Sequence, residues 1–483
     1  MKTPSAPAKW TFARLGGGFA VFFAALALHA QSPVTVQADV AHPGRAVPDD
    51  FCGLSYELKL VLPNSTTGKH YFRPDNAPLV TAFHTLGVRH LRVGGNTAER
   101  ATVPIPDHAD IDSLFAFAKA ADLKVIYTVR MEGNPPAASA EVAKYVLDHY
   151  GPLVSCLTVG NEPDKPWKYP AYLEEWKKYT AAILKEAPEA KFCGPSTTPQ
   201  AVEWAKNFVQ DMGGWDHLAY LTQHNYPRRS GEKVTDEAQA AAGRAALLSP
   251  EMYQVYQKFY DVFGPDAKAK GVGYRLEETN SYSRGGAVGV SDTFTASLWI
   301  VDYLYWWAWH DALGLNFHTG EKVMRGLPGP DRPNVYTALT STPQGMKILP
   351  TGYGMKLFDL GSHGRLVPVE ISSNPDHVNL AVYGTLAPDQ TLCLTVLNKD
   401  YGPAGHAAKL TVRSGSPATH GEVIFMSAPN GDITTINGVT LGGAEIQEDG
   451  SWNGKWETLP AAADGSVTVL VPAASAAVIK LKG

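Results

Sequence analysis

The chain has 483 residues, enough for two or three domains, and with 44% apolar and 18% charged residues it has the composition of a globular protein. A formal net charge of −5 argues against nucleic-acid binding through a positive field, so no nucleic-acid partner is expected. The 4 cysteines show no zinc or haem spacing, and no metal or other cofactor is expected. The composition does not indicate an oligomeric state.

Residues 1–30 have the layout of a secretory signal. Two lysines and an arginine precede an apolar run from Leu15 to Leu28, and the small Ala30 offers a cleavage site. The run is short for a bilayer span, and no other run of about 18 apolar residues occurs. We therefore expect a secreted or periplasmic mature protein, with no membrane contact after the signal is removed.

From residue 46 to 361, short apolar or β-branched runs alternate with amphipathic helices, as in 111–121 and 169–187. The segment 292–311 is apolar nearly all round, so it is expected to lie between the barrel and a second layer. Eight strand–helix units predict an α/β fold, a (β/α)₈ TIM barrel. The eight runs are Phe51–Glu57, Val88–Gly94, Leu123–Arg130, Val154–Gly160, Ala190–Cys193, Leu218–Asn225, Val272–Glu278 and Leu313–His318.

From residue 362 to 483 the helical spacing disappears and short alternating strands predict a C-terminal antiparallel β-sandwich domain. Residues 31–45 include a strand-like run, Val34–Val40, which is expected to join this sandwich as an edge strand. The predicted strands of the sandwich are Val378–Tyr383, Thr391–Leu397, Lys409–Val412, Glu422–Met426 and Ser466–Lys482.

The cysteines are Cys52, Cys156, Cys193 and Cys393, and three of them lie inside strand-like runs of the predicted barrel. None is paired at a recognisable motif spacing. Buried free thiols are therefore favoured over a disulfide, even in an oxidising compartment.

Two glutamates follow barrel strands at their carboxyl ends, where TIM barrels carry their chemistry. Glu162 stands in Asn161-Glu162-Pro163 after the fourth strand, and Glu278 ends the seventh. Two carboxylates about 5 Å apart can cleave a glycosidic bond with retention of configuration. Asn161 can hydrogen-bond the sugar 2-hydroxyl in the transition state. The sequence therefore predicts Glu162 and Glu278 as a catalytic pair.

Glu278 has an acidic neighbour, Glu277, and strand alternation predicts that the two side chains point to opposite faces. Arg275 shares the face of Glu277 and is expected to neutralise it there, which leaves Glu278 for the barrel mouth. Arg92 in the second strand is expected to keep Glu278 ionised or to meet a structural carboxylate instead. After the sixth strand, Tyr226 can donate to the nucleophile, and His224 is either a site member or a packed polar residue.

These stretches together resemble glycoside hydrolase family 79, which includes exo-acting β-glucuronidases and endo-acting heparanases within a broad retaining clan (clan A). The resemblance covers about residues 50–320 and adds the C-terminal sandwich with its N-terminal strand. The matching stretches are Phe51-Cys52-Gly53-Leu54-Ser55-Tyr56-Glu57, Leu91-Arg92-Val93-Gly94-Gly95-Asn96, Gly160-Asn161-Glu162-Pro163, His224-Asn225-Tyr226, Glu278-Thr279-Asn280-Ser281-Tyr282 and Ser291-Asp292-Thr293-Phe294.

The resemblance implies that Glu162 is the acid/base and Glu278 the nucleophile, and that Glu57 and Asn96 contact sugar hydroxyls. Tyr282 belongs to the matching stretch after the nucleophile and is a further candidate for substrate binding. In the family a loop after the eighth strand holds the uronate carboxylate through backbone amides and a tyrosine. Here that loop is His318 to Thr340, its glycine-rich motif is weak, and Tyr336 is the candidate tyrosine.

Three functions are compatible with these residues. The leading hypothesis is a secreted retaining exo-β-glucuronidase that acts on a carbohydrate glucuronide. An endo-acting, heparanase-like enzyme would need basic subsites, which the acidic overall charge does not favour. The clan motifs do not determine the C5 substituent, so arabinose or xylose also fits. The third hypothesis is a carbohydrate-binding protein without catalysis on the same fold.

Overall fold

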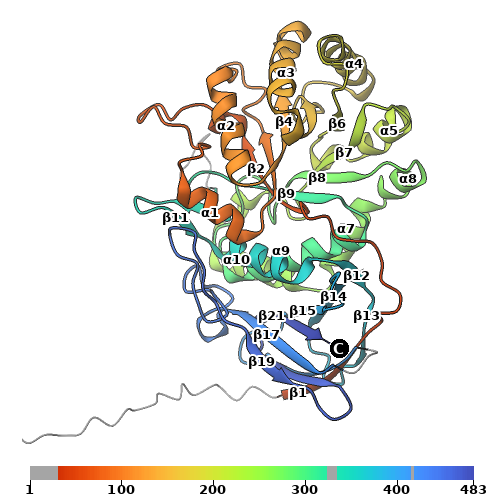
Figure 1. Cartoon of the computed structure of the whole chain (residues 1–483), viewed down its shortest axis with the longest axis vertical. Coiled ribbons are helices and arrows are strands. Elements are labelled where there is room, and N and C mark those ends of the chain that lie inside the picture. Colours follow the sequence, from red (N-terminus) through yellow and green to blue (C-terminus); the bar gives the residue numbers. More distant parts are fainter. Residues whose placement is uncertain (1–30, 324–333, 415–417, 483) are drawn as a thin grey trace, which may run out of the picture.

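The computed structural model describes residues 31–323, 334–414 and 418–482. Its upper half in Figure 1 is a closed barrel of eight parallel strands, which confirms the predicted TIM barrel. Each strand is within two residues of its predicted bounds at either end, because strands buried on both sides read as continuous apolar runs. The strands are β2 (Cys52–Glu57), β3 (His90–Gly94), β4 (Lys124–Val129), β5 (Val154–Val159), β6 (Phe192–Pro195), β7 (Leu218–Asn225), β8 (Tyr274–Thr279) and β9 (Gly314–His318).

Helices follow every barrel strand, and three of them fill the connection from β7 to β8. Local sequence sets their ends: Asp107 and Asp110, for example, form a reciprocal capping box at the start of α2. None of the helices within the described ranges is long and apolar enough to cross a bilayer. The helices are α1 (Ala77–Leu86), α2 (His108–Ala120), α3 (Pro136–Tyr150), α4 (Tyr169–Glu186), α5 (Glu203–Met212), α6 (Glu237–Leu248), α7 (Met252–Tyr260), α8 (Gly264–Ala269), α9 (Phe294–Trp309) and α10 (Pro350–Ser362).

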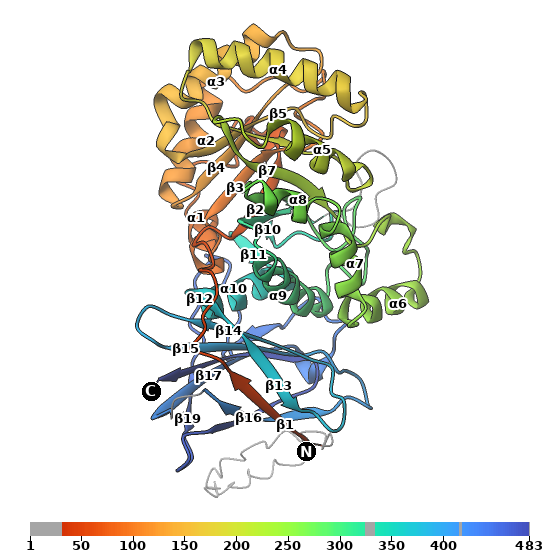
Figure 2. The same cartoon turned by 90° about the vertical axis from the view of Figure 1, so that its right-hand side faces the viewer.

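Helix α9 lies between the barrel and the second domain, beside α10 (Figures 1 and 2). Tyr303 packs against Phe317 of β9 on the barrel side. On the other side, Asp302 forms a buried 2.8 Å ion pair with Lys399, which follows strand β15 (Leu392–Asn398) of the second domain. The prediction that this helix is buried all round is confirmed, and the helix is the layer that both domains share.

The second domain is a sandwich of two largely antiparallel sheets, as predicted. The run predicted as one strand over 466–482 is two strands, because the chain turns between them with Ala474 at a φ of 47°. One sheet has the order β13 (Val369–Ser373), β1 (Gln31–Ala38), β16 (Ala407–Arg413) and β20 (Val467–Val471). The other has the order β12 (Arg365–Val367), β14 (Leu380–Leu386), β15 (Leu392–Asn398), β21 (Ser475–Lys482), β17 (His420–Ser427) and β18 (Thr440–Leu441), with β19 (Glu457–Pro460) also on β17. A separate hairpin, β10 (Leu339–Ser341) and β11 (Met346–Ile348), precedes α10.

The expectation that the N-terminal strand is an edge strand is wrong. Strand β1 lies between β13 and β16, pairing antiparallel with the first and parallel with the second. The side chains of Val34 and Val36 are fully buried in the core between the two sheets. Strand β1 lies in the interior of its sheet because neighbouring strands pair with both of its backbone edges, and its alternating valines face the other sheet.

The cysteine prediction is also wrong for one pair. Cys156 of β5 and Cys193 of β6 form a disulfide, with Cα atoms 6.1 Å apart. The strands are adjacent and in register beside these residues, which brings the two thiols within bonding range. Sequence spacing gave no sign of this, because 37 residues and a helix separate them. Cys52 and Cys393 are free and buried, as expected.

Candidate active site

A cavity of about 640 Å³ opens where the carboxyl ends of the barrel strands meet. Glu162, in the loop after β5, and Glu278, near the end of β8, both line it. These are the fourth and seventh barrel strands, so parallel strand direction places both side chains at the same end of the barrel. The volume is in the range of small-molecule sites.

The backbone before Glu162 follows an uncommon path. Gly160 has a φ of 82°, and a Cβ there would lie 3.3 Å from the side chain of Met131. Glu162 itself has a φ of 48°, which is rare for a residue with a side chain. Its amide donates to the carbonyl of Ser196, which fixes the turn. Such conformations are retained where the surrounding structure imposes them, and here the turn directs the carboxylate into the cavity.

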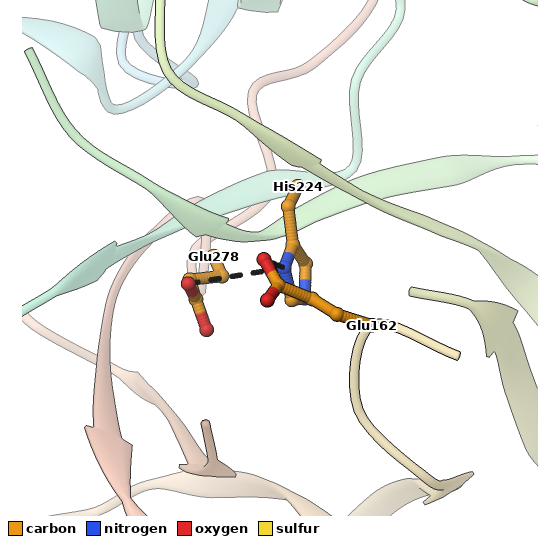
Figure 3. Close-up of side chains that lie close together, drawn as sticks. All are labelled: Glu162, His224 and Glu278. Carbon is orange, nitrogen blue, oxygen red and sulfur yellow. Dashed lines mark hydrogen bonds and ion pairs between the residues drawn. The ribbon is translucent and has the colours of Figure 1, made fainter. Parts of the chain in front are cut away.

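Figure 3 shows the side chains of Glu162, Glu278 and His224 turned toward one another. One polar atom of each lies within 4.8 Å of the others. His224 Nδ1 is 3.2 Å from Glu162 Oε1 and 3.8 Å from Glu278 Oε1. This separation suits attack at an anomeric carbon and protonation of the oxygen bonded to it, and it is shorter than the roughly 6.5–9.5 Å between the carboxyl groups of inverting enzymes.

Glu278 is held as an anion by its neighbours. Arg92 Nη1 donates to Oε2 at 2.8 Å and the Tyr226 hydroxyl donates to Oε1 at 2.9 Å. Burial alone would raise the pKa of Glu278, but the charges of His318, His224 and Arg92 hold it far below its usual value. The carboxylate is therefore ionised at ordinary pH. Arg92 and Tyr226 both contact it, as expected from the sequence.

Glu162 has a different set of partners. Besides His224, it forms an ion pair with Lys165, one turn further along the same loop. Burial and the charge of Glu278 raise its pKa, whereas His224 and Lys165 lower it, and the balance is below the usual value. Although burial opposes it, the charges of Glu278, Glu162 and Glu277 raise the pKa of His224 to about 9. The proton of the Glu162–His224 pair therefore resides mainly on the imidazole.

Glu277 does not point away from Glu278, contrary to the alternation rule. Its carboxylate accepts from Thr158 at 3.1 Å and lies 4.0 Å from Arg92 Nε, across the barrel interior. Irregular pairing on both sides of β8 changes the register near Glu277, so both glutamates face inward. Arg275 does not neutralise Glu277, because its guanidinium bonds Asn316 and the Asp50 carbonyl instead.

Four of the predicted substrate-binding residues line the cavity: Glu57, Asn96, Tyr226 and Tyr336. Glu57 accepts hydrogen bonds from the amide and hydroxyl of Thr97, which orient its carboxylate.

The other two predicted binding residues lie elsewhere. Asn161 lies just below the cavity, where its side-chain oxygen accepts from Arg92 at 2.6 Å. Tyr282 does not line the cavity and the prediction for it is not supported. Its hydroxyl accepts a hydrogen bond from Arg228 and lies near Gly243 of α6, because the chain turns outward after β8.

Sequence reasoning missed several polar residues of the cavity, among them His318 and Lys165. His318 ends β9, bonds Ser55 at 3.1 Å and lies 3.8 Å from Glu278. Lys165 donates to Asn96 at 2.6 Å and reaches Glu162. The signal that identified the glutamates, a polar residue at a strand's carboxyl end, would also have identified His318. Part of the predicted uronate loop, residues 324–333, lies outside the described residues.

The described cavity lining has more cationic than acidic side chains, which the net charge of the chain did not suggest. This lining has six cationic side chains against four carboxylates. Two of the cations have acidic partners, Lys165 with Glu162 and Arg284 with Glu232. The six are Lys59, Arg100, Lys165, Arg229, Arg284 and Lys322.

Glu162, His224 and Glu278 are also close enough to share a cation. The set fits a metal poorly, because Arg92 and Lys165 already supply positive charge to both carboxylates. A raised pKa keeps His224 protonated, so it lacks the free lone pair that a ligand needs. The arrangement suits acid/base and nucleophilic chemistry instead.

Comparison with known proteins agrees with this fold. A 4-O-α-L-rhamnosyl-β-D-glucuronidase from Fusarium oxysporum superposes with a TM-score of 0.69 at 17% identity, over 94% of this chain and all of the other. A GH51 arabinofuranosidase from Xanthomonas axonopodis pv. citri does so with a TM-score of 0.67 at 15% identity and the same coverage. The fold is that of known glycosidases.

Sequence similarity is more limited. A β-glucuronidase from Aspergillus niger is 26% identical over 187 residues, which is 34% of each chain. The chain thus matches about a third of the length of this curated relative. No family model matches the sequence.

Proposed function

We propose that this protein is a retaining exo-β-glucuronidase, which releases terminal glucuronic acid by double displacement. In the first step, Glu162 protonates the glycosidic oxygen while a Glu278 oxygen attacks the anomeric carbon, and the bond to the leaving group breaks. In the second step Glu162 accepts a proton from water, the water oxygen bonds to the anomeric carbon, and the ester to Glu278 breaks.

The single observation that carries this proposal is the convergence of the two carboxylates, within 4.8 Å of each other and of His224, in one cavity. The contacts of the two carboxylates differ as the roles of nucleophile and acid/base require. Glu278 is bonded by Arg92 and Tyr226, which suits a permanent nucleophile, whereas Glu162 contacts two residues that can carry a proton, His224 and Lys165.

The preference for an acidic sugar rests on the charge of the cavity. A uronate differs from the matching neutral sugar by a carboxylate at C5, and a basic cavity favours the anion. Tyr336, the proposed uronate partner, lies over the site near Tyr226, with ring centres 6.4 Å apart. The β-glucuronidase from Aspergillus niger, which the chain matches in sequence over 34% of its length, also supports glucuronic acid as the sugar. We further propose that the protein is secreted or periplasmic, on the strength of the N-terminal signal pattern alone.

A panel of aryl β-glycosides that differ only at C5 tests the proposal. The glucuronide should exceed the glucoside and xyloside in kcat/KM by about 10–100-fold, because a charge-assisted hydrogen bond contributes about 1.5–3 kcal/mol. The first product anomer, followed by NMR, should have the β configuration. Glu278→Ala should lower kcat by orders of magnitude, and Glu370→Ala, an exposed carboxylate of the sandwich, should not. Near-normal turnover by Glu278→Ala would refute the assignment.

A second candidate is cleavage inside an acidic polysaccharide, and the basic lining of the cavity is the observation that favours it. Cations beyond the catalytic pair can hold anionic groups on the leaving side of the scissile bond. Size analysis of a digested uronate-containing polysaccharide separates the two candidates. Rapid shortening of the chains would indicate internal cleavage, whereas release of single uronate residues indicates exo action.

A further inference from the structure

Glu277 is a buried carboxylate that the proposed reaction does not use. Its side chain is fully buried, and it lies directly below the catalytic pair. Burial alone would raise its pKa, but nearby His224 and Arg92 hold the pKa below the usual value, so the group is an anion. An anion inside a barrel core is costly unless it is paired with a cation and hydrogen-bonded. Its neighbours indicate what that charge does.

Glu277 and His224 face each other in an isolated contact. His224 Nε2 lies 3.7 Å from Glu277 Oε1, and neither atom has a hydrogen-bond partner among the described residues. The opposite ring nitrogen, Nδ1, contacts Glu162 Oε1 at 3.2 Å. The imidazole therefore bridges the acid/base carboxylate above and the buried carboxylate below. With an anion at each nitrogen, the doubly protonated ring is favoured.

Glu277 shares this role with the two carboxylates near the other ring nitrogen. Glu278 makes the largest contribution to the raised pKa of His224 and Glu162 contacts Nδ1, whereas Glu277 is the carboxylate that faces Nε2. Arg92 forms an ion pair with Glu278 at 2.8 Å and approaches Glu277 to 4.0 Å. Thr158 is the neutral donor that bonds Glu277. The charged or titratable groups that face the pair are Arg92 on β3, Glu162 and Lys165 after β5, Tyr172 on α4, Tyr220 on β7, Glu278 on β8 and His318 on β9.

We propose that Glu277 is a positioning residue: it holds His224 as an imidazolium against Glu162 and so keeps a transferable proton beside the acid/base. The inference rests on the proposed role of Glu162. When substrate binds, the Nδ1 proton moves to Glu162 Oε1, leaving a neutral imidazole and a carboxylic acid. That acid protonates the leaving oxygen as the glycosidic bond breaks. In the second step the proton that Glu162 takes from water returns to Nδ1.

Glu277→Gln keeps the side-chain volume and removes the charge. The pKa of His224, followed by NMR of histidine-labelled protein and assigned by comparison with His224→Gln, should fall by about one unit or more. Because the proton of the Glu162–His224 pair then leaves at lower pH, the basic limb of the kcat/KM profile on an aryl β-glucuronide should move to lower pH by a similar amount. Glu174→Gln, the same charge change at an exposed position of α4, should move neither.

Thr158→Val removes the neutral donor to Glu277 but leaves the carboxylate charged, so the pKa of His224 should stay raised and the basic limb should not move to lower pH. If Glu277→Gln does not fold, Glu277→Asp, which draws the charge back from His224, should shift both readouts in the direction expected for Glu277→Gln by a smaller amount. In either Glu277 variant, a lower melting temperature with an unchanged His224 titration and an unchanged basic limb would overturn the proposal. The NMR titration needs no substrate. An unchanged His224 titration in Glu277→Gln therefore refutes the role of Glu277, whereas lack of hydrolysis of any glucuronide refutes the proposed function.

Discussion

Arg92 connects the parts of the site at the residue scale. Its guanidinium donates to Glu278 and Asn161 and faces Glu277, while its own side chain is fully buried. Burial alone would lower the pKa of Arg92, but the charges of Glu277 and Glu278 outweigh this effect and raise the pKa above its usual value, so the group stays protonated. One fixed cation thus holds the nucleophile and the amide that neighbours the acid/base, which couples the positions of the two catalytic groups.

Tyr226→Phe should lower kcat by about 10–100-fold. The hydroxyl donates to Glu278 Oε1 at 2.9 Å in a buried setting, and hydrogen bonds to charged groups contribute about 1.5–3 kcal/mol. Because Tyr226 helps to depress the pKa of Glu278, its loss should also move the acid limb of the kcat/KM profile to higher pH. The measurement is the pH dependence on an aryl β-glucuronide, with the half-exposed Tyr401→Phe as control. Equal profiles for the two variants would contradict the assignment of Tyr226.

The strand-end rule predicts most of the site from sequence, since Glu162, Glu278, Tyr226 and Arg92 meet where parallel strands end. It fails for Glu277, because alternation assumes regular pairing and the sequence does not reveal the irregular register of β8. Residues beyond a strand end follow no period at all. For this reason Tyr282, four residues after Glu278, could not be assigned to the cavity or away from it.

At the scale of elements, α9 is the part of the chain that both domains need. Its sequence is apolar on every side, with one acid, Asp302, at the boundary with the sandwich. That carboxylate accepts from Tyr253 and Tyr383 as well as from Lys399. A buried ion pair with its remaining acceptor sites bonded fixes the docking geometry more specifically than apolar contact does.

Lys399→Ala should lower the free energy of unfolding by about 3–5 kcal/mol, because it leaves the Asp302 carboxylate buried without its cation. Urea unfolding followed by fluorescence measures the change. Lys144→Ala removes an exposed ion pair within helix α3 and should have a much smaller effect. Similar losses in the two variants would mean that the buried pair does not stabilise the junction.

The strands and helices of the barrel were predictable because the local spacing of apolar residues indicates each of them. Which distant segments pair with one another was less predictable. The position of β1 between β13 and β16, and the bond between Cys156 and Cys193, depend on which distant segments become neighbours. Such contacts are set by topology, and no local pattern in 31–38 or around the cysteines encodes them.

At the scale of the whole molecule, charge is distributed unevenly. The chain has a net charge of −5, yet the cavity is lined by six cations. Low-dielectric walls around a cleft strengthen the local electrostatic field. A ligand in the cleft therefore interacts with the charge of the lining and not with the net charge of the chain. Net charge alone was therefore a poor guide to the choice between neutral and acidic substrates.

The buried charge cluster should also shape stability against pH. The folded pKa values of Glu277 and Glu278 lie below the usual 4.5, so their contribution is present above pH 4.5 and lost as the pH falls further. The pKa of His224 is raised from 6.5 to about 9, so its contribution is complete below pH 6.5 and lost as the pH rises through about 9. The free energy of unfolding, measured with urea, should be lower at pH 9.5 than at pH 5.5, and His224→Gln should reduce this difference. An equal difference in that variant would mean that other groups cause it.

The interior place of β1 has a consequence for biosynthesis. This strand precedes the barrel in the chain, but β13 and β16, its two partners, begin at Val369 and Ala407. A ribosome therefore releases the strand more than three hundred residues before anything exists to receive it, and its valine-rich edge stays open while the barrel folds. The sandwich therefore closes only when its C-terminal strands pair with a segment that was synthesised before the barrel.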